Sequence, residues 1–356
     1  MENNQTQEAL LKVQGTIGRE LNIDQAAINR DLLKDRHSQS MTIKVLSVIG
    51  GILATGAFLL FLELANFSSN HIPLFILSGI FFIAAIWINK KYDRVLFDTL
   101  SVCIYLLSFI LFGMGYSKFD GYTDVPLFVY QALAILTIII SRSYILTFCA
   151  ILISTGTFLA YFSYKEVPEL NNALLVLVAI LFIYFTFNEG KLMKRKAIQG
   201  KRYLAIRTGL VFSYLICLYY FSRPNYMPNA WIIDWATSGL LIAMTLWLIN
   251  CLLNRFLCEE LGKKIFISLV VLICLGFTAM SPAISGSLLL LLVSFKVNYK
   301  TGFALGIIAF IFFIGMFYYD LDISLLKKSI AMFVSGVFFL LLYLMIFKKS
   351  ISHEKA

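Results

Sequence analysis

Twelve apolar stretches run through this sequence, and they constrain its fold more than any other feature. Most of them approach the roughly 17–25 residues that an α-helix needs to cross a bilayer. The sequence therefore predicts an all-α fold, a polytopic transmembrane helix bundle of 12 spans. The predicted spans cover residues 43–64, 72–89, 96–115, 126–141, 143–163, 171–188, 208–222, 231–252, 265–281, 283–295, 301–318 and 325–347.

The composition excludes a water-soluble globular protein. Hydrophobic residues make up 60% of the 356 residues, and charged residues make up only 14%. A typical soluble domain carries roughly 25% charged residues, and it cannot bury this much apolar surface. The same figures exclude a disordered chain, a collagen and a disulfide scaffold.

Cysteine and histidine usage gives no ligand set for zinc, haem or an iron–sulfur cluster. No two of the six cysteines form a Cys-x-x-Cys pair, and the three histidines, His37, His71 and His353, lie far apart in sequence. Gly-x-Ser-x-Gly, His-Glu-x-x-His and P-loop motifs are also absent from the sequence. We therefore expect no metal, no cofactor and no catalytic residues, and a membrane enzyme is the least favoured interpretation.

The placement of charge predicts which side of the membrane each loop faces. When the N-terminus is put in the cytoplasm and the spans alternate, 25 of the 30 lysines and arginines fall on the cytoplasmic side. The remaining ones are Lys118, Lys165, Arg223, Lys327 and Lys328. The positive-inside rule produces this asymmetry, so both termini are predicted to be cytoplasmic. The net charge of +10 is then a signal of topology, and nucleic acid is not an expected partner.

The chain divides into three segments. Residues 1–41 form a polar, amphipathic extension in the cytoplasm, residues 42–348 form the transmembrane bundle, and residues 349–356 form a cytoplasmic tail. The longest internal loop, residues 189–207, divides the spans six and six. The fourth and tenth spans are short and begin at Pro126 and Pro282. Paired short spans point to a transporter site; the other interpretation is two tilted or partly re-entrant hairpin helices packed inside the bundle.

Tyrosines mark the predicted outer ends of the spans. They are Tyr116, Tyr161, Tyr164, Tyr219, Tyr220, Tyr318 and Tyr319. One interpretation is an aromatic belt that fixes the depth of the helices in the membrane, and the other is an outward-facing cleft that stacks a ring. Asp234 is the deepest carboxylate. It suits either cation coupling or a helix N-terminus that its charge stabilises.

The most distinctive stretch is the predicted hairpin that joins the last two spans, residues 317–329. Its tyrosine run, its Leu-Leu pair and its Lys-Ser pair resemble the end of a bacterial membrane family known as domain of unknown function 4401. The matching residues are Tyr318, Tyr319, Leu321, Leu325, Leu326, Lys328, Ser329 and Gly336. The resemblance implies a polytopic protein of the bacterial cytoplasmic (inner) membrane, with no assigned activity.

Two hypotheses explain the hairpin. In the first, carboxylates neutralise the lysines and lock the turn; in the second, Lys328, Ser329 and free helix amides bind an anion. The candidate residues are Tyr318, Tyr319, Asp320, Asp322, Ser324, Lys328 and Ser329.

The sequence favours a transporter or flippase-like protein that moves a small or lipid-linked substrate. The alternative is a non-catalytic membrane scaffold or assembly partner. The expected partners are the lipid bilayer and another membrane protein.

Overall fold

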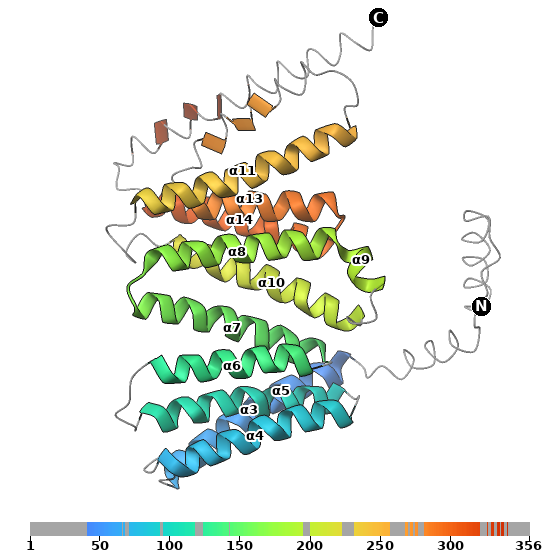
Figure 1. The fold of residues 1–356 in the computed structure, drawn as a ribbon, viewed down its shortest axis with the longest axis vertical. Coiled ribbons are helices and arrows are strands. Elements are labelled where there is room, and N and C mark those ends of the chain that lie inside the picture. Colours follow the sequence, from blue (N-terminus) through green and yellow to red (C-terminus); the bar gives the residue numbers. More distant parts are fainter. Residues whose placement is uncertain are drawn as a thin grey trace, which may run out of the picture.

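A computed structural model describes residues 41–340 of the chain, apart from several short gaps. The gaps are residues 66, 68–70, 93–94, 118–123, 142, 195–199, 223–230, 257–267, 270, 273–274, 277–280, 321–325, 327–328, 331–332, 335 and 338–339. Within the described part every regular element is a helix, which confirms the predicted helical bundle. The helices lie side by side, stacked along the longest axis of the molecule, with each helix running across that axis (Figure 1).

The helices are α3 (Met41–Leu64), α4 (His71–Lys91), α5 (Val95–Ser117), α6 (Asp124–Ile140), α7 (Tyr144–Tyr164), α8 (Pro168–Phe187), α9 (Glu189–Lys194), α10 (Gly200–Phe221), α11 (Trp231–Phe256), α13 (Pro282–Lys296) and α14 (Lys300–Asp320). Eight of the described helices are long and apolar enough to cross a membrane. Two more, α6 and α13, are apolar but only 17 and 15 residues long. They coincide with the two spans that were predicted to be short.

Ten of the 12 predicted spans therefore coincide with described helices. The other two, residues 265–281 and 325–347, lie largely outside the described residues, and so do the extension and the tail. The chain is a helical, multi-pass membrane protein, and the count of 12 spans stays a prediction.

Prolines and left-handed residues mark the ends of several helices. Pro168 and Pro282 occupy the first turns of α8 and α13, where a proline costs no intrahelical hydrogen bond. Glu166 and Asn298 have φ angles of 56° and 57° in the turns after α7 and α13, so the chain reverses within a few residues. These tight turns keep successive helices antiparallel.

The loop predicted at residues 189–207 is largely helical. It contains α9 and the first turns of α10, which begins at Gly200 instead of near residue 208. The reason is that Arg202 and Arg207 find partners on neighbouring helices, so the charged start of α10 lies against the bundle. The division into two six-span halves stays a prediction.

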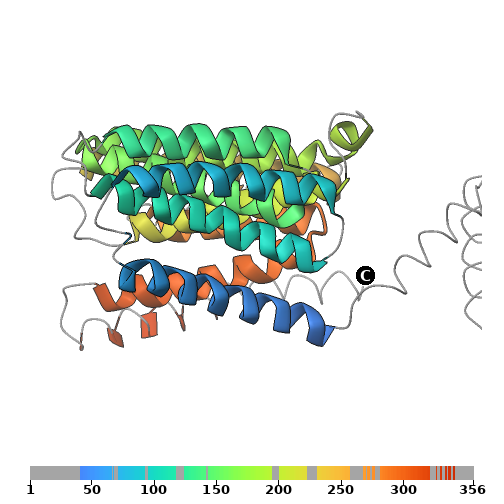
Figure 2. The ribbon, with the colours of Figure 1, turned by 90° about the horizontal axis from the view of Figure 1, so that it is seen from below.

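Three clusters of buried apolar side chains form the core. The largest joins α7, α8, α10, α11, α13 and α14, around residues such as Phe182 and Leu289. The second joins α4, α5 and α7, and the third joins α3, α4 and α5. Figure 2 shows α3, in the darkest blue, below the main layer of helices.

Two glycines of α13 and α14 allow neighbouring helices to approach closely. A Cβ atom at Gly306 of α14 would lie 2.9 Å from the Cα atom of Leu291 in α13. At Gly286 of α13 it would lie 2.4 Å from a methyl group of Leu218, where the Tyr214 hydroxyl also donates to the Gly286 carbonyl over 3.1 Å. Small residues therefore set the spacing of these helices, as is common in membrane bundles.

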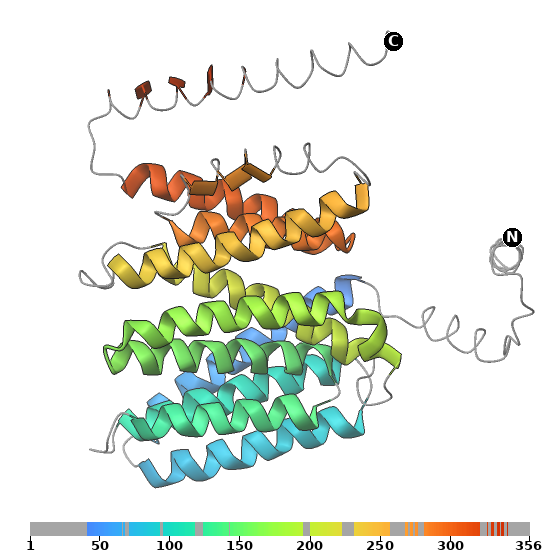
Figure 3. The same cartoon turned by 45° about the horizontal axis from the view of Figure 1, so that its top comes forward.

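The two ends of the bundle differ in chemistry. At one end, here called the basic end, lie Lys90, Lys91, Arg202, Arg207, Lys296 and Lys300, together with α9. At the other, the tyrosine end, lie Tyr116, Tyr161, Tyr164, Tyr219, Tyr220, Tyr318 and Tyr319. Figure 3 shows the same stack of helices from a second direction.

Candidate functional site

An apolar groove lies between α8 and α11. These helices pack against each other, and the groove has a volume of about 620 Å³. It is lined by Asn172, Ala173, Val176, Leu177, Ile180, Leu181, Ala236, Thr237 and Leu240. The side chains of Leu177 and Leu240 are 52% and 51% exposed, so the groove opens away from the interior of the bundle.

A polar pair closes the groove toward the tyrosine end. The Thr237 hydroxyl donates a hydrogen bond to the Asn172 side-chain oxygen over 2.8 Å, and both residues are buried. Asn172 lies near the start of α8 and Thr237 near the start of α11, so the pair joins the two helices at this end. The groove is thus apolar along its length and polar at one tip.

A second polar cluster lies beside this tip, inside the bundle. The Asn171 amide donates to the Tyr220 hydroxyl over 3.3 Å and to the Ser163 hydroxyl over 3.4 Å. The Ser163 and Tyr220 oxygens are 2.9 Å apart. The buried Asn171 side-chain oxygen accepts no hydrogen bond from the described residues, and the buried Ser238 hydroxyl forms none with them. Unpaired groups of this kind are costly, and they are typical of places where water or a ligand binds.

Toward the basic end, aromatic rings continue the same seam. Phe187 follows Ile180 by seven residues on α8, and Trp247 follows Leu240 by seven residues on α11, so each ring lies on the groove-facing side of its helix. The two ring centroids are 6.2 Å apart. The Lys296 ammonium lies 4.4 Å from the Phe187 centroid and 5.7 Å from the Trp247 centroid.

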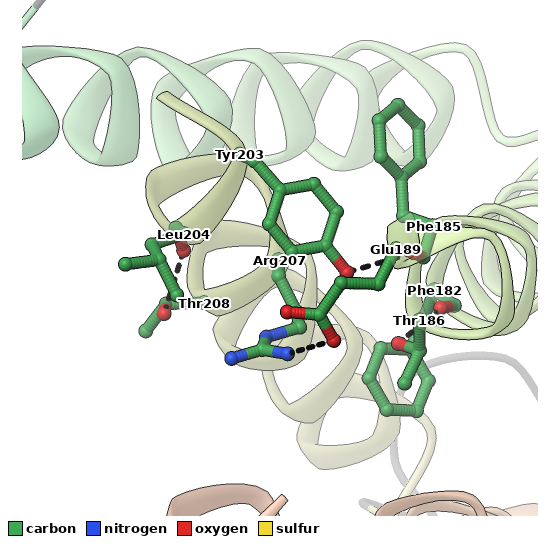
Figure 4. A network of polar contacts seen from close by, with 8 residues as sticks. All are labelled: Phe182, Phe185, Thr186, Glu189, Tyr203, Leu204, Arg207 and Thr208. Atoms are coloured by element: carbon green, nitrogen blue, oxygen red, sulfur yellow. Dashed lines mark hydrogen bonds and ion pairs between the residues drawn. The ribbon is translucent and has the colours of Figure 1, made fainter. Parts of the chain in front are cut away.

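Next to this cation is a network around Arg207 (Figure 4). A terminal guanidinium nitrogen of Arg207 lies 3.1 Å from the Glu189 carboxylate. Its central carbon lies 4.1 Å from the ring centroid of Tyr299 and 5.4 Å from that of Tyr203. The Tyr203 hydroxyl donates to the Phe185 carbonyl over 2.9 Å. The residue Arg207 is only 8% exposed, so its guanidinium joins α9, α10 and the α13–α14 turn.

A second arginine caps α6. Arg202 donates from one terminal nitrogen to the carbonyls of Ile138 and Ile139, over 2.5 and 2.6 Å. These are among the last carbonyls of α6, which lack intrahelical partners and attract cations. The short helix α6 is therefore held at its end by α10.

The structure describes only part of the predicted hairpin site. The rings of Tyr318 and Tyr319 lie 5.8 Å apart near the end of α14, and Asp320 is the last residue of that helix. Ser329 is helical and exposed. Asp322, Ser324 and Lys328 lie outside the described residues, so both hypotheses for the hairpin stay predictions.

Other predicted residues lie near helix ends. Asp234 is in the first turn of α11, three residues before Thr237 of the groove. Lys165 and Asp124 form an ion pair at the tyrosine end, and this hydrogen bond raises the pKa of the lysine above its usual value. The stabilisation from the pair is therefore present at neutral pH and is lost as the pH rises through the raised pKa.

The groove and the environments of Lys296 and Arg207 were not predicted from the sequence. The available signals were the adjacent amides Asn171 and Asn172 in an apolar span and a lysine at the end of a short helix. Among the described residues no three histidine, cysteine, aspartate or glutamate side chains come together as metal ligands would.

Comparison with known proteins gives one match. The sequence model of a family described as a domain of unknown function (DUF4401) matches residues 40–349. No curated protein and no solved structure matches the chain.

Proposed function

We propose a function for this chain from the premise that it belongs to the DUF4401 family, whose function is unknown. The proposal is that the protein is a transporter or flippase-like protein for a lipid or lipid-linked substrate. The groove between α8 and α11 holds an acyl chain of that substrate. The observation that carries the proposal is an apolar groove that opens outward from a membrane-spanning bundle and has a polar tip.

The surroundings of the groove support an acyl chain as its occupant. Both α8 and α11 are long and apolar enough to span a membrane, so the groove opens into hydrocarbon. An acyl chain that enters it gains little from the hydrophobic effect, because lipid tails are as apolar as leucine. Specificity must then come from the shape of the groove and from its length, which ends at the buried pair Asn172 and Thr237.

Asp234 precedes Thr237 by three residues along α11, and its role in cation coupling or at the helix N-terminus stays a prediction. The buried, unpaired oxygen of Asn171 lies beside the same tip, so the acyl chain would end where the surroundings become polar.

We further propose 12 spans with both termini in the cytoplasm of a bacterium. Support comes from the basic residues that share one end of the bundle and from the ten described apolar helices. The two remaining spans are expected at residues 265–281 and 325–347. Cysteine labelling in whole cells tests this topology. Gly121→Cys and Met227→Cys should react from outside and Gln199→Cys only after the membrane is opened; labelling of position 199 from outside would overturn it.

Groove binding is tested by filling the groove. Leu177→Trp puts an indole into the space of an acyl chain, and Leu60→Trp makes the same change on the exposed face of α3. We expect the first variant to copurify with less lipid than the wild type, as measured by mass spectrometry of the extract. The second should match the wild type. Equal lipid content in all three proteins would exclude the groove as a binding site.

One observation favours the second candidate, a membrane scaffold or assembly partner. The interior shared by α7, α8, α10, α11, α13 and α14 is filled by a single cluster of buried side chains. A rigid, filled bundle suits a protein that presents its surface to a partner in the membrane. If Leu177→Trp leaves lipid content unchanged while crosslinking through α3 captures a specific protein, the scaffold is the better account.

A further inference from the structure

Lys296 is a cation placed well inside the basic end of the bundle. It ends α13, whose 15 residues span about 22 Å at 1.5 Å per residue, less than the roughly 30 Å of a bilayer core. Its ammonium lies against Trp247 and Cys251 of α11, which precede the last residue of that helix, Phe256, by nine and five positions. The neighbouring helix therefore extends at least one turn beyond the charge.

The partners of this ammonium are weak ones. It donates one hydrogen bond to the Cys251 sulfur over 2.9 Å and faces the rings of Phe187 and Trp247. Among the described residues no carboxylate pairs with Lys296, and the one carboxylate of the adjacent network, Glu189, is paired with Arg207. A lysine near a helix end reaches the membrane interface, where an anionic group can pair with it.

The lysine is half-buried, and its neighbour Trp247 is 55% exposed on the outer side of the seam. Tryptophan prefers the level of the lipid headgroups, where its ring is apolar and its N–H stays polar. Basic pockets between helices at this level bind anionic headgroups. The surroundings of Lys296 therefore suit an anionic headgroup, and the apolar groove begins further along the same two helices.

We propose that Lys296 binds the phosphate of an anionic lipid, whose acyl chain follows the α8–α11 seam past Phe187 toward the groove. This inference rests on the proposed function and names its substrate class as a phosphate-bearing lipid. Lysine suits the role because its ammonium acts as a compact charge with three donors, of which one is used by Cys251.

The experiment compares lipid binding to the full-length chain in detergent by native mass spectrometry. The probes are phosphatidylglycerol, which is anionic, and phosphatidylcholine, which is zwitterionic. We expect the wild type to prefer phosphatidylglycerol and Lys296→Gln to lose about fivefold in affinity for it, the effect of one basic residue near a membrane surface. Lys296→Arg should retain the preference, which separates loss of charge from a failure to fold.

The matched control is Lys300→Gln, four residues further along the chain at the exposed start of α14. It should bind phosphatidylglycerol like the wild type. If both glutamine variants lose the preference equally, general surface charge explains the binding and the inference is overturned. Inorganic phosphate is added as a competitor, and complete displacement of the lipid by phosphate at a similar concentration would assign the site to free phosphate instead.

Leu177→Trp distinguishes this inference from the proposed function. Loss of lipid by Leu177→Trp with an unchanged preference in Lys296→Gln would overturn the headgroup site and leave the groove in place. Unchanged binding in both variants would overturn both.

Discussion

At the residue scale, Arg207 is the side chain whose environment departs most from expectation. Its position in sequence predicts a cytoplasmic loop, whereas it lies in α10 with its guanidinium buried between Tyr203, Tyr299 and Glu189. No pattern in the sequence reveals this, because Glu189 and Tyr299 come from α9 and from the α13–α14 turn. The sequence predicts that a charged residue lies at a membrane end, but it does not predict which residue pairs with it.

The arginine can be tested by substitution. We expect Arg207→Ala to lower the free energy of unfolding by about 2 kcal/mol, because a partly exposed charge-assisted hydrogen bond and its ring stacking are lost. Arg207→Lys should restore only part of this, since an ammonium does not stack flat on Tyr299. Chemical denaturation in detergent measures the change, and Lys191→Ala on the exposed face of α9 is the control. Equal stability of Arg207→Ala and wild type would show that the network contributes nothing.

At the scale of elements, helix identity was the most predictable property. Ten predicted spans coincide with helices because long apolar runs have few alternatives in a membrane. The lengths of α6 and α13 were predictable for the same reason. The groove was not, because it depends on which faces of α8 and α11 meet, and apolar residues surround both helices.

The close spacing of α13 and α14 can be tested at a glycine of α14, and a second glycine of the same helix serves as the control. Gly306→Ala should destabilise the protein by about 1–3 kcal/mol, because the new methyl group meets the backbone of α13 at Leu291. At Gly315, also on α14, no atom of another described element lies within 4 Å of the added methyl group. Gly315→Ala should therefore be neutral or stabilising by up to about 1 kcal/mol. Thermal unfolding of both variants in detergent measures these changes in stability. If Gly315→Ala were the more destabilising variant, the close approach of α14 to its neighbour would lie elsewhere.

The turn after α14 carries a further prediction. If it forms either the lock or the anion site, Lys328→Gln should reduce stability or activity more than Lys327→Gln, since only Lys328 matches the family pattern. The readouts are thermal unfolding and lipid content of the purified variants. If both substitutions had equal and negligible effects, the turn would be an ordinary loop and neither hypothesis would hold.

At the scale of the whole molecule, the bundle should not depend on its N-terminal extension. The family match begins at residue 40, and the described core clusters start within α3. We therefore expect deletion of residues 1–38 to preserve membrane insertion and the melting temperature. A deletion through residue 64 removes α3 as well and serves as the contrast. Unfolding of the bundle after the shorter deletion would show that the extension is an integral part of it.

The contrast between α3 and α10 has a consequence for biosynthesis. The apolar span of α3 has a mean hydropathy of 2.0 with 6% of its residues buried, whereas that of α10 has 1.6 with 50% buried. Helix α3 can therefore move from the translocon into lipid as a single helix, without a partner helix. Helix α10 carries Arg202 and Arg207, which are costly in lipid until α6 supplies its terminal carbonyls and α9 its carboxylate. Both partners precede α10 in the chain, so the ribosome delivers each acceptor before the cation that needs it.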